Sequence, residues 1–346
     1  MLTPADRAMA DEVLAPPGPR QRRAIAKVIT LLESTHADHR PRADEILNTL
    51  LPRSGQSFRL GISGVPGVGK STFIETLGLQ LLEQEHRVAV LAVDPSSSVS
   101  GGSILGDKTR MARLSAADCA FIRPSPSSGT LGGVAEKTRE SMLVLEAAGY
   151  DIVIVETVGV GQSETAVAGM TDMFALLQLP NAGDDLQALK KGITELADII
   201  VVNKADIDEA AAARARAEIT SSLRLLGLHG RPEDTPDDAA VWRPEVLQVS
   251  ALTGQGMAGF WAEVCRFRAL QSAGGRLERR RQQQSEAWMR ERLEAGLRDR
   301  FRAHPAVQAA WPATLADVRA GRLAASVAAR RLLDLMDNHE AVDRSQ

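Results

Sequence analysis

Short apolar runs alternate with helix-like stretches through the middle of the chain. Runs of four to eight mainly apolar residues are FRLGISG (58–64), RVAVLAVD (87–94), CAFIR (119–123), DIVIVE (151–156), MFALLQL (173–179), DIIVVN (198–203) and VLQVS (246–250). Strands that are apolar on both faces are typical of a parallel sheet covered by helices on each side. The pattern therefore predicts an α/β domain over residues 51–270, with a mostly parallel sheet flanked by helices.

Both ends of the chain read as helical. AIAKVITLLE (24–33) has apolar positions at helical spacing, PPGP (16–19) precedes it, and residues 1–50 are predicted to form an N-terminal arm. The stretch from 257 onward is again helical, whereas the Pro-rich residues 230–244 read as a surface loop. A charged helix with a narrow apolar stripe needs a partner. Residues 271–346 are thus interpreted as a dimerisation arm of a homodimer, the alternative being that the arms only cover the domain.

The composition argues against partners that are nucleic acids or membranes. The 346 residues carry a net charge of −3 and only 3% aromatic residues, which argues against a nucleic-acid partner. No apolar run approaches the roughly 20 residues that span a bilayer, and the start lacks the pattern of a signal peptide, so no membrane partner is expected. Two distant cysteines, Cys119 and Cys265, fit a reducing compartment. A cytoplasmic protein is expected.

A phosphate-binding pattern lies between the first apolar run and a helix-like stretch. GISGVPGVGKST (61–72) contains Gly64-x-x-x-x-Gly69-Lys70-Ser71, the P-loop pattern in its required context. Glycines let successive N–H groups face a polyphosphate, Lys70 can reach the β- and γ-phosphates, and the Ser71 hydroxyl can bind Mg²⁺. The fold is therefore predicted to be a P-loop NTPase. The predicted phosphate-binding residues are Gly64, Val65, Pro66, Gly67, Val68, Gly69, Lys70, Ser71 and Thr72.

Two further motifs indicate the base. Asn203-Lys204-x-Asp206 follows an apolar run, and this spacing would let the Asp206 carboxylate accept from the N1–H and exocyclic amine of guanine. Ser250, Ala251 and Leu252 lie at the end of the next run and match the loop whose backbone closes over guanine O6. Open α/β sheets bind ligands at the carboxyl ends of their strands. The three motifs in order predict GTP rather than ATP.

Acidic residues end two of the apolar runs. Asp94 and Glu156 are the last residues of theirs, and Glu156-x-x-Gly159 has the spacing of a loop that senses the γ-phosphate. A Ser- and Gly-rich stretch after Asp94 carries Asp107, a candidate switch carboxylate or, alternatively, a helix-capping residue in a surface loop. Asp94, Asp107 and Glu156 are predicted near Mg²⁺ and the attacking water.

The motifs together resemble a known family. GVPGVGKST, AVDPSSSVSGGSILGDKTRM, FIRPSPSSGTLGG, VETVGVGQSE, LPNAGDDLQALKKGI and NKAD look like the MeaB/ArgK/MMAA group of P-loop GTPases, in the SIMIBI class, over about residues 20–270. The resemblance implies a GTP-hydrolysing homodimer that acts as a chaperone. Its partners would be an adenosylcobalamin-dependent acyl-CoA mutase and the adenosyltransferase that supplies the cofactor. Methylmalonyl-, isobutyryl- and 2-hydroxyisobutyryl-CoA mutases all fit.

The resemblance also assigns roles to residues. Lys70, Asp107, Glu156 and Lys190 would be catalytic, and QLPNAGDDLQALKKGI (178–193) would be a switch that contacts the mutase. The polar positions of this switch are matched by Asp184, Gln187 and Lys190, while Asp185 stands where relatives have Glu. Val160 follows Gly159 and cannot orient water, so intrinsic hydrolysis is expected to be slow. Lys190, brought to the phosphates when the partner binds, would supply the missing charge, the alternative being that Lys190 and Lys191 belong to a solvated helix face.

Two other functions remain open at this point. A GTP-dependent metallochaperone would need clustered Cys and His, whereas the six His and two Cys are scattered along the chain. A transport-protein kinase would need a phosphate-acceptor site, which no motif in the sequence indicates.

Overall fold

The structure contains the predicted parallel sheet. A computed structural model of the chain describes residues 2–36, 38–93, 111–124, 131–157, 163–180, 191–225 and 242–343. The sheet has seven strands in the order β3-β2-β4-β1-β5-β6-β7, and every neighbouring pair is parallel. The strands are β1 (Phe58–Gly64), β2 (Val88–Val93), β3 (Ala120–Arg123), β4 (Ile152–Thr157), β5 (Met173–Gln178), β6 (Ile199–Val202) and β7 (Glu245–Gln248). The α/β prediction is confirmed.

Helices precede, separate and follow these strands. Around the sheet they are α1 (Pro4–Val13), α2 (Pro19–Glu33), α3 (His39–Leu50), the 3-10 helix η1 (Leu51–Arg53), α4 (Lys70–Glu83), α7 (Ala112–Ala116), α8 (Leu131–Ala147), α9 (Ser163–Ala168), α10 (Lys191–Leu196), α11 (Glu209–Leu225) and α12 (Met257–Ala273). The C-terminal ones are α13 (Arg276–Ala303), α14 (Pro305–Arg319) and α15 (Ala325–Asp343). The helical character predicted for both ends of the chain is confirmed.

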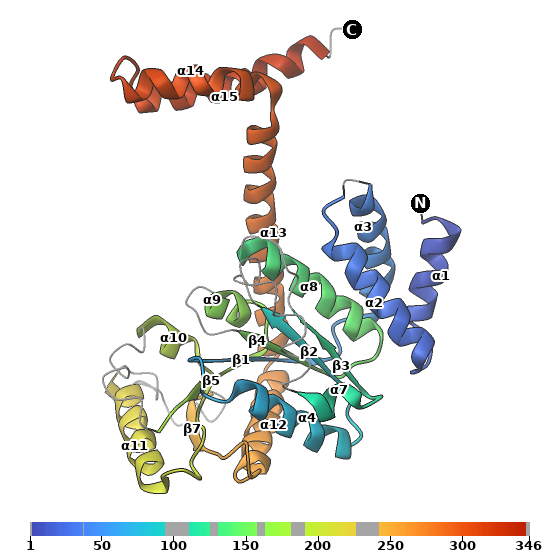
Figure 1. Cartoon of the computed structure of the whole chain (residues 1–346), viewed down its shortest axis with the longest axis vertical. Helices are drawn as coiled ribbons and strands as arrows, with labels where there is room; N and C mark the ends of the chain where they lie inside the picture. Colours follow the sequence, from blue (N-terminus) through green and yellow to red (C-terminus); the bar gives the residue numbers. More distant parts are fainter. Residues whose placement is uncertain are drawn as a thin grey trace. The chain divides into compact units, whose positions relative to one another are not determined.

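Each face of the sheet has its own apolar layer. Side chains of α4, α7 and α12 pack on one face, where the rings of Phe73 and Phe260 meet edge to face at 4.9 Å. Side chains of α8, α9 and α11 pack on the other face, together with those of the N-terminal helices. Figure 1 shows α8 and α9 on the side of the sheet opposite to α4 and α12. Every residue of β2, β4 and β5 is buried. Helices on both faces explain why these strands read as continuous apolar runs.

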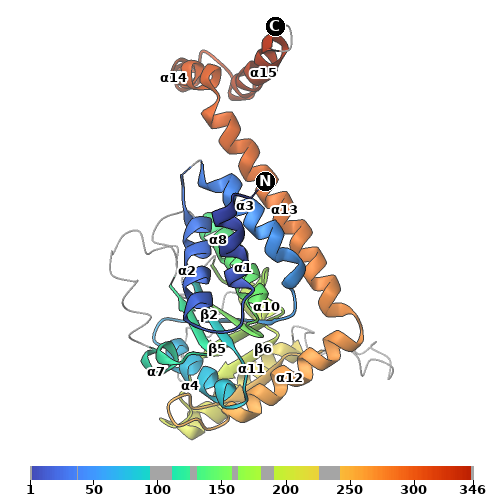
Figure 2. The same cartoon turned by 90° about the vertical axis from the view of Figure 1, so that its right-hand side faces the viewer.

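Of the N-terminal helices, α2 and α3 pack on α8, and α1 packs on α2 and α3 (Figure 2). Arg40 of α3 donates to Glu140 at 2.8 Å and lies 3.1 Å from Glu136, both of them buried on α8. These helices and the sheet form one compact unit, Met1–Arg280, and residues Arg281–Gln346 form a second. The arm boundaries at 50 and 270 stay a prediction.

Aspartates precede three of the strands and tie the amino edge of the sheet together. Asp151 accepts from the backbone N–H of Arg87, Asp172 from that of Arg59 and Asp198 from that of Phe174, each at 2.7–2.8 Å. In each case the donor lies at the start of a neighbouring strand, so one carboxylate satisfies an N–H that the ladder does not reach.

Buried charges at this edge have guanidinium partners. Glu146 of α8 accepts two hydrogen bonds from Arg59, at 2.7 and 2.9 Å, and a third from the Ser57 hydroxyl. Burial alone would raise the pKa of Glu146, but the Arg59 hydrogen bonds and charge outweigh burial and hold that pKa below its usual value. Burial raises the pKa of Asp198, and its two-pronged pair with Arg280 offsets only part of that effect.

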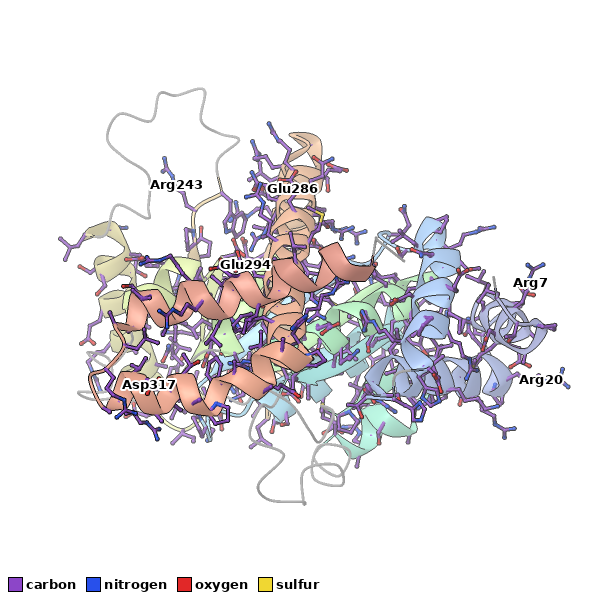
Figure 3. All side chains as sticks on the ribbon, turned by 90° about the horizontal axis from the view of Figure 1, so that it is seen from above. Arg7, Arg20, Arg243, Glu286, Glu294 and Asp317 are labelled. Atoms are coloured by element: carbon purple, nitrogen blue, oxygen red, sulfur yellow. The ribbon has the colours of Figure 1, made fainter. Side chains whose placement is uncertain are left out.

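The second unit is helical. Within it α14 and α15 lie side by side (Figure 3), and Arg322 in the connecting turn donates to Asp317 near the end of α14 at 2.7 Å. Along α13, Met289, Leu293 and Leu297 recur every four residues and are each more than half exposed. Across the described residues, no helix is long and apolar enough to cross a membrane.

Candidate nucleotide-binding site

The P-loop has the backbone conformation that an anion cradle needs. Gly64, at the end of β1, and Gly69, directly before α4, both have positive φ values, 154° and 93°. A Cβ at Gly64 would lie 2.5 Å from the Leu177 carbonyl oxygen, and one at Gly69 would lie 2.8 Å from Asn203 Nδ2. Only glycine satisfies both demands. Helix α4 begins at Lys70, directly after this loop, and the first N–H groups of a helix are the ones that bind anions.

Lys70 lies over this loop as the first residue of α4. Its ammonium donates to the Gly64 carbonyl at 2.7 Å and to the Val65 carbonyl at 3.3 Å. These contacts hold the ammonium against the backbone of the loop. A lysine ammonium near backbone N–H groups attracts polyphosphates both by its charge and by hydrogen bonds.

Asn203 joins the phosphate loop to the motif predicted to read the base. Its Nδ2 donates to the Val68 carbonyl of the P-loop at 2.8 Å, and its Oδ1 accepts from Ala251 N–H at 3.0 Å. Next in the chain, Lys204 adopts φ 61°, an uncommon conformation for a residue with a side chain. A Cβ at Gly69 would lie 3.7 Å from Lys204 Cε, so the lysine stem lies beside the P-loop. Asp206 is exposed in the following turn.

The third motif lies against the same helix. The Ala251 carbonyl accepts from the Thr76 hydroxyl of α4 at 2.7 Å, and Ser250 is fully buried, whereas Leu252 is 79% exposed. The structure thus brings the P-loop, Asn203 and residues 250–252 together through side-chain hydrogen bonds. Thr76 belongs to none of the three sequence motifs, so the sequence did not predict that it contacts this loop. In the sequence, only its position in the helix after the P-loop pointed to the site.

Glu156 lies at the carboxyl end of β4, next to β1 and β2. It is buried and pairs in register with Ile62 of β1 and Ala92 of β2. Beside it, the hydroxyls of Ser63 and Thr157 share a hydrogen bond of 2.8 Å. The carboxylate of Glu156 and the half-buried hydroxyl of Ser71 are oxygen donors of the kind that Mg²⁺ takes. Both side chains have the chemistry of a Mg²⁺ ligand, and their role in a Mg²⁺ site stays a prediction.

Several predicted site residues lie outside the described residues. They are Asp94, Asp107, Gly159, Asp184, Gln187 and Lys190, together with Val160 and Asp185. Elsewhere, in the parts of the chain that the structure does describe, no group of three Cys, His, Asp or Glu side chains could hold a metal by itself. The two cysteines are free and exposed.

Comparison with known proteins identifies the family. The model of the family described as Methylmalonyl Co-A mutase-associated GTPase MeaB matches residues 25–306. The chain belongs to the MeaB family. Among its relatives, Probable GTPase Rv1496 of Mycobacterium tuberculosis is 50% identical over 91% of this chain and 91% of its own length. Methylmalonic aciduria type A homolog, mitochondrial, of Mus musculus is 46% identical over 90% of this chain and 76% of its own length.

A solved structure shares the MeaB-type fold. The crystal structure of LAO/AO transport system kinase has a TM-score of 0.74 and 37% sequence identity, covering 97% of this chain and 99% of that chain. The sequence-based resemblance to the MeaB/ArgK/MMAA group, the P-loop GTPase fold and the class of GTPases are thereby confirmed. Binding of guanine nucleotides is a property of the MeaB family of GTPases.

Proposed function

We propose that the chain binds GTP with Mg²⁺ at the carboxyl edge of its sheet and hydrolyses it to GDP and phosphate. The observation that supports this most is the bridge made by Asn203, which holds the P-loop and the loop 250–252 at the two ends of one side chain. A protein that selects one nucleoside triphosphate must contact its phosphates and its base at the same time. The bridge fixes the distance between the groups that would do so.

The proposed roles follow from where each group lies. Lys70 and the N–H groups at the start of α4 would hold the β- and γ-phosphates, and Asp206 would accept from the guanine N1–H and amine. Ser71 and Glu156, with Asp94 and Asp107, would hold Mg²⁺, which supplies positive charge to the phosphate oxygens. The remaining nucleotide-contacting residues would be Val65, Pro66, Gly67, Val68, Thr72, Gly159 and Lys204.

The cellular task that fits best is the gating of cofactor loading into an adenosylcobalamin-dependent acyl-CoA mutase. Support comes from the family description, which names methylmalonyl-CoA mutase association, and from the mouse relative named for methylmalonic aciduria. Hydrolysis would be slow in the isolated protein, because Val160 cannot orient water. Binding of the mutase at Asp184, Gln187 and Lys190 would bring Lys190 to the phosphates, and an adenosyltransferase would supply the cofactor.

The test is GTP turnover with Mg²⁺, measured with the protein alone and with a candidate mutase of the same organism. We expect a low basal rate that the mutase increases. Lys190→Ala should lower the stimulated rate and leave the basal rate as it was, while the neighbouring Lys191→Ala serves as a matched control. A fast basal rate that no such mutase changes would contradict the chaperone role, and a stimulated rate unaffected by Lys190→Ala would remove this lysine from it.

We further propose that the arm over residues 271–346 forms the interface of a homodimer. The exposed apolar stripe of Met289, Leu293 and Leu297 supports this, since an exposed row of large apolar side chains is usually covered by a partner. Leu293→Glu with Leu297→Glu should convert the dimer to a monomer in analytical ultracentrifugation. The exposed Leu225→Glu of α11 is the control that should leave the mass unchanged.

A second candidate is phosphate transfer to a protein. The structural relative at 37% identity is named LAO/AO transport system kinase, which is the observation that favours it. Incubation with γ-labelled GTP separates the two activities, because a GTPase releases labelled phosphate whereas a kinase leaves label on a protein acceptor. We expect release of phosphate alone.

A further inference from the structure

Residues 250–256 form a loop that is hydrogen-bonded to itself. Ser250 N–H donates to the Gln255 carbonyl and Gly254 N–H to the Ser250 carbonyl, both at 2.9 Å, and Thr253 N–H donates to the Ser250 hydroxyl at 3.2 Å. Three such bonds join the residues of this short loop into one compact body. What fixes that body to the rest of the site therefore fixes every N–H group it presents.

Two side chains hold this loop at Ala251. Asn203 accepts from the Ala251 N–H at 3.0 Å, and the Thr76 hydroxyl donates to the Ala251 carbonyl at 2.7 Å. The N–H and the carbonyl of Ala251 therefore each have a side-chain partner. Because Asn203 also bonds to Val68 of the P-loop, and Thr76 belongs to the helix that the P-loop opens, the four residues form a closed ring.

Thr76 is too far along α4 to touch phosphate. It follows Lys70 by six residues, which places it about 9 Å further along the helix axis at 1.5 Å per residue. Its influence on a nucleotide would pass through the loop. There the N–H groups of Ser250 and Ala251 are already bonded, to Gln255 and to Asn203, so the next N–H along the loop belongs to Leu252.

We propose that Thr76 is a positioning residue for base selection, which holds the loop so that the Leu252 N–H donates to O6 of guanine. The proposal rests on the proposed function, because it requires a guanine nucleotide in this site. It adds a residue outside the motifs to the machinery that separates guanine from other bases. Thr76 acts on O6 alone, and the phosphates and the Asp206 contact are held independently of it.

The experiment compares two nucleotides in two proteins. Isothermal calorimetry with Mg²⁺ gives the Kd of GDP and of 2-aminopurine riboside diphosphate, which lacks O6 and N1–H, for the wild type and for Thr76→Val. The valine keeps the shape and removes the hydroxyl. We expect Thr76→Val to weaken GDP binding about tenfold, as the loss of one hydrogen bond would, and to change binding of the analogue less than about twofold.

Two controls accompany this comparison. Thr76→Ser keeps the hydroxyl and should bind GDP like the wild type. Thr220→Val on α11 removes a hydroxyl that bonds to the Arg216 carbonyl of its own helix, and should change neither Kd. If Thr76→Val does not fold, Thr76→Ala is read in the same way.

The outcomes are distinct. Equal weakening of both nucleotides would make Thr76 a general scaffold residue and overturn the proposal, as would unchanged GDP binding. A wild type that binds GDP no more tightly than the analogue would instead refute the guanine site itself, and the proposed function with it.

Discussion

At the amino ends of the strands, acids meet side chains and backbone groups of the protein itself. Glu146 has Arg59 and Ser57, and Asp198 has Arg280 and the Phe174 N–H. At the carboxyl ends, the prominent groups are the N–H groups of a glycine loop, a lysine that donates to carbonyls of that loop, and a second loop gripped at Ala251. At one edge the acids have partners within the protein, and at the other the P-loop and its lysine form the predicted phosphate site. We therefore expect residues of the amino edge to serve stability and residues of the carboxyl edge to serve binding.

The largest effect that would test this separation is expected from Glu146→Ala. The Glu146 side chain is fully buried and that of Arg59 is 14% exposed, and removal of one partner of a buried pair costs about 3–5 kcal/mol. Urea unfolding should show that loss, while the folded variant binds GDP with the Kd of the wild type. Glu83→Ala, at an exposed position of α4, should change the free energy of unfolding by less than about 0.5 kcal/mol. A changed GDP affinity in Glu146→Ala would mean that the two edges are coupled.

At the opposite edge, Lys70→Ala should weaken nucleotide binding and leave the stability of the protein unchanged. Loss of a charged hydrogen bond to phosphate should weaken GTP binding by about 1.5–3 kcal/mol. The nucleotide-free protein should unfold at the urea concentration of the wild type, because the carbonyls to which the lysine donates belong to its own loop. Lys27→Ala, on the exposed side of α2, should leave both quantities unchanged. A large loss of stability in Lys70→Ala would contradict the separation.

The hydroxyl pair of Ser63 and Thr157 is a structural contact within the binding edge. Both residues are buried, so Thr157→Val leaves the Ser63 hydroxyl without its partner and should cost about 1–3 kcal/mol. The double variant Ser63→Ala with Thr157→Val removes both polar groups and should recover most of that loss. A double-mutant cycle in urea measures the coupling. Additive losses would show that the two hydroxyls do not depend on one another.

The smallest effect concerns pH. The pKa of Glu146 is lower in the folded protein than its usual value of 4.5, so the folded state binds fewer protons than the unfolded state near that pH. The stability that Glu146 contributes is therefore present above pH 4.5 and is lost as pH falls through the folded pKa. One proton limits the slope to about 1.4 kcal/mol per pH unit. The stability difference between the wild type and Glu146→Gln should shrink in urea titrations below pH 4.5, and a difference that grows instead would reverse the sign.

The strands and motifs that are contiguous in the sequence could be predicted from it, whereas contacts between distant residues could not. The run DIVIVE predicts a strand at 151–156 and the structure has Ile152–Thr157, because apolar continuity is a local signal. The P-loop and the residues around Asn203 were found for the same reason, since each motif is contiguous. The bonds of Glu146 to Arg59 and of Thr76 to Ala251 join residues 87 and 175 positions apart, and no local pattern marks such pairs. The aspartates directly before three apolar runs are visible in the sequence, but their hydrogen bonds to N–H groups of neighbouring strands were not predicted.

The most direct test of a guanine-nucleotide site at the carboxyl edge is the free energy of unfolding of the wild type, measured with Mg²⁺ alone, with GDP and with ADP. A ligand that binds only the folded state adds about 2.7 kcal/mol at a concentration one hundred times its Kd. GDP should give an increment of this size, and ADP at the same concentration should give none. Equal increments from GDP and ADP, or none from either, would contradict the site.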